Sequence, residues 1–221
     1  MTKFLGLLIL GILGLAVSGC ASVRTYQVQV NGYTEGAAPS LAPGASLFVL
    51  EDQKAQNPLL EKEIKAKVEF LLEKRGYVLA PYDRADFFLS FAYGMGTPQT
   101  VAVTGPTWGF GWGFGSGYCG PGVSTGIYWP NCGPYSTETQ ALYDRWLRLT
   151  VVEGKYYRDT GKSRTIWVGE ARSTGTSSDL REVLNSLLIA AFEQIGQNTG
   201  KAVPIQIKQN DPRFSGLERV H

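Results

Sequence analysis

The sequence predicts an α+β domain in which an antiparallel or mixed sheet is covered on one face by two helices, with a long glycine-rich and aromatic insert. Three observations lead to this expectation. Several segments have the two-residue hydrophobic period of strands, and two longer segments have the 3.6-residue period of amphipathic helices. The order strand, strand, helix, strand, strand, insert, strand, strand, helix is typical of a sheet with helices packed on one side.

The chain begins with the features of a bacterial export signal. Lys3 supplies a positive charge, residues 4–17 form an apolar run, and Ser18 and Gly19 are small. The run has 14 residues, whereas a permanent membrane helix needs about 20. We therefore expect residues 1–19 to be a cleaved signal peptide.

The segment Val17-Ser18-Gly19-Cys20 resembles the bacterial lipobox. This resemblance implies that Cys20 becomes the first mature residue and carries a diacylglyceryl group and further acyl chains, which together give stable anchoring. Ala21 follows, and it is not the aspartate that commonly retains lipoproteins in the inner membrane. We therefore expect a lipid-anchored protein of the outer membrane that faces the periplasm.

Two strands and a helix are predicted next. Residues 23–30 and 47–50 favour strands, and the Gly, Pro and Ala-rich residues 36–44 separate them. Asn57 is a helix N-cap followed by proline, and Gly76 ends the helix. Its apolar stripe consists of Leu60, Ile64, Val68, Leu71 and Leu72. Its opposite face, which we expect to be solvated, carries the i, i+4 pairs Glu61 with Lys65 and Glu63 with Lys67.

The second half of the chain continues with strands and a helix. Residues 77–80 form a short strand, and residues 86–93 and 141–152 alternate between apolar and polar positions. Residues 165–171 are the hairpin partner of 141–152, and Gly161-Lys162-Ser163 lies in the turn between them. The last helix begins after Ser178 and Asp179 and ends at Gly196, and a polar tail with a strand candidate at 204–208 follows.

Composition limits the classes of function. Removal of the first 19 of 221 residues leaves 202, enough for one domain with a proper core. The mature chain has 20 Lys and Arg against 19 Asp and Glu, so no strong positive field is available to attract nucleic acid. Cys119 and Cys132 are an even pair in an exported protein, and a disulfide between them is the default expectation.

Most catalytic chemistry is disfavoured. The chain has one histidine, His221 at its end, so the usual base of Ser-His or Cys-His catalysis and the usual zinc ligand are missing. We predict neither a metal nor a cofactor, since the glycine spacings fit neither a P-loop nor a dinucleotide fingerprint. Two carboxylate pairs, Asp83 with Asp86 and Asp144 with Glu170, leave a glycan-acting enzyme as the alternative.

The most unusual segment comprises residues 94–135. These 42 residues contain no charged side chain, 12 of the 27 glycines and eight aromatic residues. In an extended backbone four rings that alternate with glycine would share one face, about 7 Å apart. The six candidate binding residues are Trp108, Phe110, Trp112, Phe114, Tyr118 and Trp129. Such rings stack on sugars, lie at a lipid interface or anchor a protein partner; alternatively, the segment packs over its own sheet.

Five short motifs resemble envelope lipoproteins of the DUF4136 family, a domain of unknown function. They are Asn57-Pro58-Leu59-Leu60, Arg75-Gly76-Tyr77, Ala85-Asp86-Phe87, Leu147-Arg148-Leu149 and Trp167-Val168-Gly169-Glu170-Ala171. The resemblance covers most of the mature chain and implies a periplasm-facing lipoprotein without a defined activity. It supplies no catalytic residue.

We therefore divide the chain into a signal peptide (1–19), an anchor with first strand and linker (20–46), an α+β domain (47–197) with its insert (94–137), and a polar tail (198–221). We expect a non-catalytic lipoprotein with a binding or structural role through the insert. Its expected partners are the membrane, through the lipid anchor, and an envelope protein or glycan.

Overall fold

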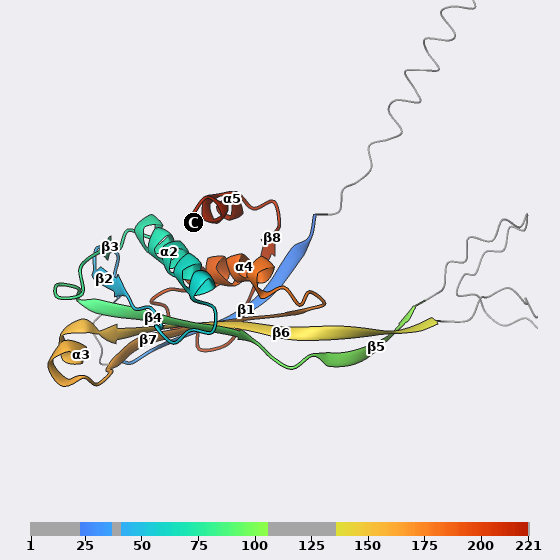
Figure 1. Ribbon diagram of the computed structural model, residues 1–221, viewed down its shortest axis with the longest axis horizontal. Coiled ribbons are helices and arrows are strands. Elements are labelled where there is room, and N and C mark those ends of the chain that lie inside the picture. Colours follow the sequence, from blue (N-terminus) through green and yellow to red (C-terminus); the bar gives the residue numbers. More distant parts are fainter. Residues whose placement is uncertain (1–22, 37–40, 106–135, 221) are drawn as a thin grey trace, which may run out of the picture.

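The body of the protein is a mixed β-sheet with its two long helices on one face (Figure 1). The computed structural model describes residues 23–36, 41–105 and 136–220. Its strands are β1 (Thr25–Thr34), β2 (Ser46–Val49), β3 (Val78–Leu79), β4 (Phe87–Met95), β5 (Gln99–Gly105), β6 (Ser136–Glu153), β7 (Thr165–Gly175) and β8 (Val203–Lys208). Its helices are α2 (Pro58–Lys74), α3 (Gly154–Thr160), α4 (Leu180–Glu193) and α5 (Pro212–Glu218).

The strand order is β3-β2-β4-β6-β7-β1-β8, and β5 pairs with β6 outside this row. β2 runs parallel to β3 and β4, whereas all other pairs are antiparallel. α2 and α4 cover one face of the sheet, and α5 packs against α4 (Figure 1). The predicted α+β class is confirmed.

The two long helices begin where their caps predict. The Asn57 side chain accepts a hydrogen bond from the Leu60 amide at 3.1 Å, and Gly76 adopts φ +83° just after α2. Asp179 accepts hydrogen bonds from the first amides of α4. The apolar faces of both helices are buried against Val28, Leu89, Leu149 and other residues of the sheet. None of the helices in the described part of the chain is long and apolar enough to cross a membrane.

The connection between β6 and β7 differs from the predicted hairpin turn. It contains the seven-residue helix α3, which ends at Gly161 with φ +69°. The pairing of β6 with β7 is shifted between Val151 and Val152. α3 lies on the face of the sheet opposite α2, where Ala85, Phe88 and Val152 form a second, small core (Figure 1).

The C-terminal residues also differ from the predicted polar tail. The strand candidate at 204–208 is part of β8, which pairs with β1 and places Ile205 and Ile207 in the core. In α5, Phe214 and Leu217 are buried as well. In this segment only every second or third residue is apolar and packs into the core. The segment therefore appears polar in sequence.

The polar face of α2 is only partly solvated, contrary to expectation. Glu61 is 3% exposed and Lys67 6% exposed. Glu61 accepts a hydrogen bond from the Asp52 amide at 3.0 Å. Lys67 donates to Asn185 of α4 at 2.9 Å and pairs with Glu63. Both charges are therefore enclosed by neighbouring elements, and both have partners there.

Candidate functional site

A two-stranded arm is the most prominent departure from a compact sheet (Figure 1). β6 has 18 residues, but its pairing with β7 ends at Tyr143, opposite Gly175. The preceding residues 136–142 pair only with β5. Seven residues of strand extend over about 23 Å. The described side chains of this arm are exposed or half-buried and none belongs to the core, so the arm is a ribbon without a helix cover.

The arm carries the predicted insert at its tip. β5 ends at Gly105, which is paired with Ser136 at the start of β6. All six candidate binding residues lie between these two positions, and so do Cys119 and Cys132. Together with Cys20 they fall outside the described residues. The aromatic ladder, the disulfide and the lipidation therefore stay predictions.

The N-terminal strand and the arm leave the body at the same end of the sheet (Figure 1). Arg172 of β7 is paired with Gln29 on one side and with Trp146 on the other. β1 and β6 run in the same direction, so Thr25 is level with Leu142, where the arm begins. Cys20 precedes Thr25 by five residues, which span at most about 17 Å.

Hydrogen bonds and an ion pair connect the start of β1 to the first turn of α4. Glu182 of α4 forms an ion pair with Arg24 and accepts a hydrogen bond from the Tyr26 hydroxyl at 3.2 Å. The Ser177 hydroxyl donates to the same carboxylate at 2.9 Å. Arg145, which is 3% exposed, donates to the Ser177 carbonyl at 3.1 Å, and burial lowers the pKa of this guanidinium. These contacts therefore hold the start of β1, the described part of the chain nearest to Cys20, against α4.

Of the two predicted carboxylate pairs, Asp144 and Glu170 do lie on one face. They line a hollow of about 370 Å³ on the face without α2 and α4. Asp144 is opposite Thr174, and Glu170 is opposite Arg148. The Cα atoms of the two residues are therefore four positions apart along adjacent strands, about 13 Å. In glycosidases the two carboxyl groups themselves stand roughly 5 to 9.5 Å apart.

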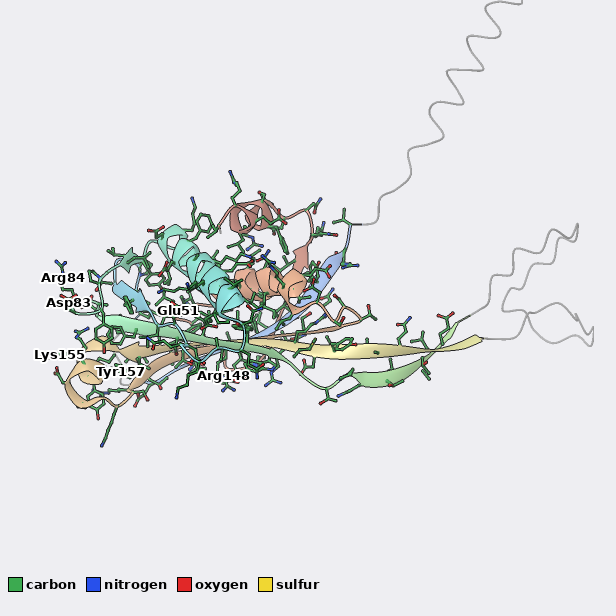
Figure 2. The ribbon with its side chains drawn as sticks, viewed as in Figure 1. Glu51, Asp83, Arg84, Arg148, Lys155 and Tyr157 are labelled. Carbon is green, nitrogen blue, oxygen red and sulfur yellow. The ribbon has the colours of Figure 1, made fainter. Side chains whose placement is uncertain are left out.

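Each of these carboxylates has an arginine partner. Glu170 Oε1 accepts a hydrogen bond from Arg148 Nε at 2.8 Å and forms an ion pair with Nη2 of the same guanidinium at 2.7 Å. Asp144 lies 3.6 Å from Arg172. Arg148 points away from the helix layer (Figure 2). Each carboxylate is therefore engaged by a different arginine on the open face of the sheet.

Asp83 and Asp86 are not a buried couple either. Asp83 is exposed and lies beside Arg84, 3.8 Å away, at one end of the sheet (Figure 2). Asp86 accepts hydrogen bonds from the Ser46 hydroxyl and amide, which joins β2 to the start of β4. Within residues 23–36, 41–105 and 136–220, no three His, Cys, Asp or Glu side chains are grouped to hold a metal ion.

A family model described as Domain of unknown function (DUF4136) matches residues 19–195. The chain belongs to this family. No curated protein matches the sequence.

Solved structures similar to this DUF4136 chain include the following three. A PDZ domain protein from Parabacteroides distasonis is 9% identical, with a TM-score of 0.47, and the match covers 88% of this chain and 42% of that one. The PelC dodecamer from Paraburkholderia phytofirmans is 14% identical, with a TM-score of 0.40 and coverage of 77% and 98%. A DUF4136 family protein from Bacteroides thetaiotaomicron is 20% identical, with a TM-score of 0.33 and coverage of 76% and 92%. The chain thus spans less than half of the Parabacteroides protein.

The motifs on which the DUF4136 resemblance rested have structural roles here. The Trp167 indole lies over Gly169 and donates to the Gln197 carbonyl at 3.0 Å. A Cβ at Gly169 would lie 2.2 Å from this ring, and one at the paired Gly32 would lie 2.3 Å from the Gln197 oxygen. Two glycines in register therefore admit the indole and the end of α4 onto the sheet.

The other motifs support the same packing. Tyr77 donates from its hydroxyl to the Leu41 carbonyl at 3.3 Å, and Ala85 is fully buried. Leu147 and Leu149 point into the core, whereas Arg148 between them lies on the opposite face.

Sequence reasoning did not identify the buried Arg145, because a single charged residue at an inward position has no periodic signature.

Proposed function

We propose that the protein is a lipid-anchored, periplasm-facing lipoprotein of the outer membrane, and that it binds the membrane surface through the aromatic insert at the tip of the β5–β6 arm. The observation that carries this proposal is that β1 and the arm leave the body at the same end (Figure 1). An anchor on Cys20 then places the arm on the side of the protein nearest the bilayer.

The reach of the two segments supports this orientation. From the level of Thr25 and Leu142, the chain to Cys20 spans at most about 17 Å, and the arm extends about 23 Å. The arm tip therefore reaches the level at which an acylated Cys20 enters the bilayer.

The composition of the insert and arm favours a membrane over water. Residues 94–135 carry no charge, and Glu138 is the only charged residue in β5 and in residues 136–142 of β6. Tryptophan and tyrosine concentrate at membrane interfaces because their rings are apolar and their polar atoms reach water. Exposed apolar area costs about 25 cal/mol per Å² in water, so contact with a bilayer stabilises such a segment.

A non-catalytic role is supported by the chemistry available. His221 is the only histidine of the chain. The Asp144 and Glu170 carboxylates are each paired with a different arginine, and the two residues lie four positions apart along adjacent strands. A glycan-acting enzyme that uses a carboxylate pair is therefore the weaker candidate.

The anchor is tested by mass spectrometry of the mature N-terminus. We expect a chain that begins at Cys20 and carries diacylglyceryl and acyl groups, whereas the Cys20→Ser variant stays unprocessed or soluble. An unmodified Cys20 in membrane-purified protein would contradict the anchor.

Membrane binding by the insert is tested with the unlipidated mature chain in which Cys20 is serine. We expect this protein to float with phospholipid vesicles, and we expect deletion of residues 107–117 to reduce flotation strongly while the melting temperature is unchanged. Equal flotation of both proteins would contradict the role of the insert and leave the anchor untouched.

A further inference from the structure

The open face of the sheet carries a hollow that is separate from the arm tip and has no part in the proposed membrane contact. It lies on β4, β6 and β7, on the side opposite α2 and α4, and is lined by Gly96, Asp144, Trp146, Arg148, Glu170 and Arg172. We propose that this hollow binds a neutral saccharide chain, with Trp146 as the platform on which a sugar ring stacks.

Trp146 is laid flat on the sheet by a glycine. Gly94 of β4 is the cross-strand partner of Trp146. A Cβ at Gly94 would lie 2.8, 2.9 and 3.1 Å from three atoms of the indole, so one face of the ring covers the glycine. The other face is directed away from the sheet into the hollow. A flat aromatic face that is only half-buried offers an apolar platform for the C–H face of a pyranose.

Two ion pairs flank this platform with fixed polar groups. Arg148 and Glu170 are joined by a hydrogen bond and an ion pair, and Arg172 lies across from Trp146 beside Asp144. Arg148 Nε and Nη2 both contact Oε1 of Glu170. Among the described residues, neither Nη1 of Arg148 nor Oε2 of Glu170 has a hydrogen-bond partner, so both can bind a ligand. Paired planar donors and acceptors are suited to the vicinal hydroxyls of a sugar.

The charge of the hollow decides between ligand classes. Two arginines and two carboxylates give a formal charge of zero, so neither a phosphate chain nor a cation is favoured. The polar lining disfavours an acyl chain or an apolar peptide. On β1, Gln29 and Asn31 are opposite Arg172 and Glu170 and extend the row of hydrogen-bonding side chains. This combination of one ring and neutral, paired polar groups fits a saccharide.

The test is a titration of the full mature chain with chitotetraose, cellotetraose and maltotetraose, followed by tryptophan fluorescence and calorimetry. We expect at least one of these tetrasaccharides to bind. We expect Trp146→Ala to weaken that binding about tenfold or more, the loss of roughly 1.4 kcal/mol of stacking and contact. Arg148→Met is expected to weaken it as well, whereas Trp146→Phe retains most of it.

Two further variants separate a binding role from a structural one. Gly94→Ala keeps the indole but pushes it off the sheet, so it should weaken saccharide binding. Tyr156→Ala removes an exposed aromatic residue of α3 that does not line the hollow, and should leave binding unchanged. The proposal is overturned if none of the three tetrasaccharides binds the wild-type chain, or if Trp146→Ala, folded by circular dichroism, binds as well as wild type.

Discussion

At the scale of single residues, the buried Trp167 indole packs closely on Gly169 and donates to the Gln197 carbonyl just after α4. Gly169→Ala should destabilise the protein by about 1 to 3 kcal/mol, because the added methyl group would lie 2.2 Å from the fully buried ring. Urea denaturation measures this change. Gly36→Ala is the matched control, since nothing lies within 4 Å of a Cβ there. Equal stability of both variants would show that the indole can move freely.

The cluster of Glu63, Lys67 and Arg181 predicts that the stability of the protein depends on pH. Burial alone would raise the pKa of Glu63, but hydrogen bonds from Lys67 and Arg181 outweigh it and hold this pKa below its ordinary value. A lowered pKa in the folded state stabilises the protein above the unfolded pKa, and that stability is lost as the pH falls through the folded pKa. Glu63→Gln should therefore be less stable than wild type at pH 7, with a difference that shrinks toward pH 3.

Denaturant midpoints at several pH values measure this effect. The control is Glu73→Gln, a change at an exposed residue of the same helix. A stability difference between wild type and Glu63→Gln that stays constant from pH 7 to pH 3 would contradict the role of the ion pairs.

The face on which a residue lies could be predicted from the sequence where the hydrophobic period of its strand or helix determines that face. Leu147 and Leu149 alternate with Arg148, and the structure places them on the expected faces. Lys67 was expected to be exposed to solvent because an i, i+4 ion pair with Glu63 is sufficient to account for a lysine on the surface of the helix. Its second partner, Asn185, is 118 residues away, and no local pattern reports that contact.

At the scale of elements, the arm is expected to be energetically independent of the body. Its described residues lie outside the core, and a two-stranded ribbon is marginally stable in water. Gly96 donates to the Asp144 carbonyl at 2.7 Å, so β4 and β6 are already paired at the base of the arm. Replacing residues 97–143 with Asn-Gly, a two-residue hairpin turn, should leave the melting temperature nearly unchanged.

Calorimetry of this shortened chain measures the prediction, and circular dichroism shows whether the body retains its structure. A large fall in melting temperature would mean that the arm or the insert packs on the body. That result would favour the alternative in which the insert covers its own sheet.

The ends of an element were predictable where capping residues flank a long segment with a helical hydrophobic period. Asn57, Pro58 and Gly76 delimit α2 for this reason. α3 has only seven residues, too few for a helical period to emerge. β5 and the first part of β6 fell within the predicted insert 94–137, because Gly, Thr and Ala-rich residues without a buried face do not alternate between apolar and polar.

At the scale of the whole molecule, the proposed function depends on which segments leave the body at the same end. The start of β1 and the arm are far apart in sequence, and their common end of the sheet follows only from the pairing of β1 with β7 and of β7 with β6. Local patterns cannot predict strand pairing over such separations. The sequence did indicate the two chemical parts of the proposal, a segment that resembles a lipobox and an uncharged aromatic segment, and the sheet topology brings the described strands next to them to one end.

The most direct test of this arrangement is tryptophan quenching in vesicles that contain brominated phospholipids. The lipidated mature protein is compared with a variant in which Trp108, Trp112 and Trp129 are replaced by leucine, after both are shown to float with the vesicles. We predict strong quenching of the wild type and little quenching of the variant, whose remaining Trp146 and Trp167 lie in the body. Equally weak quenching of both proteins would place the insert away from the bilayer and contradict its proposed contact with the membrane.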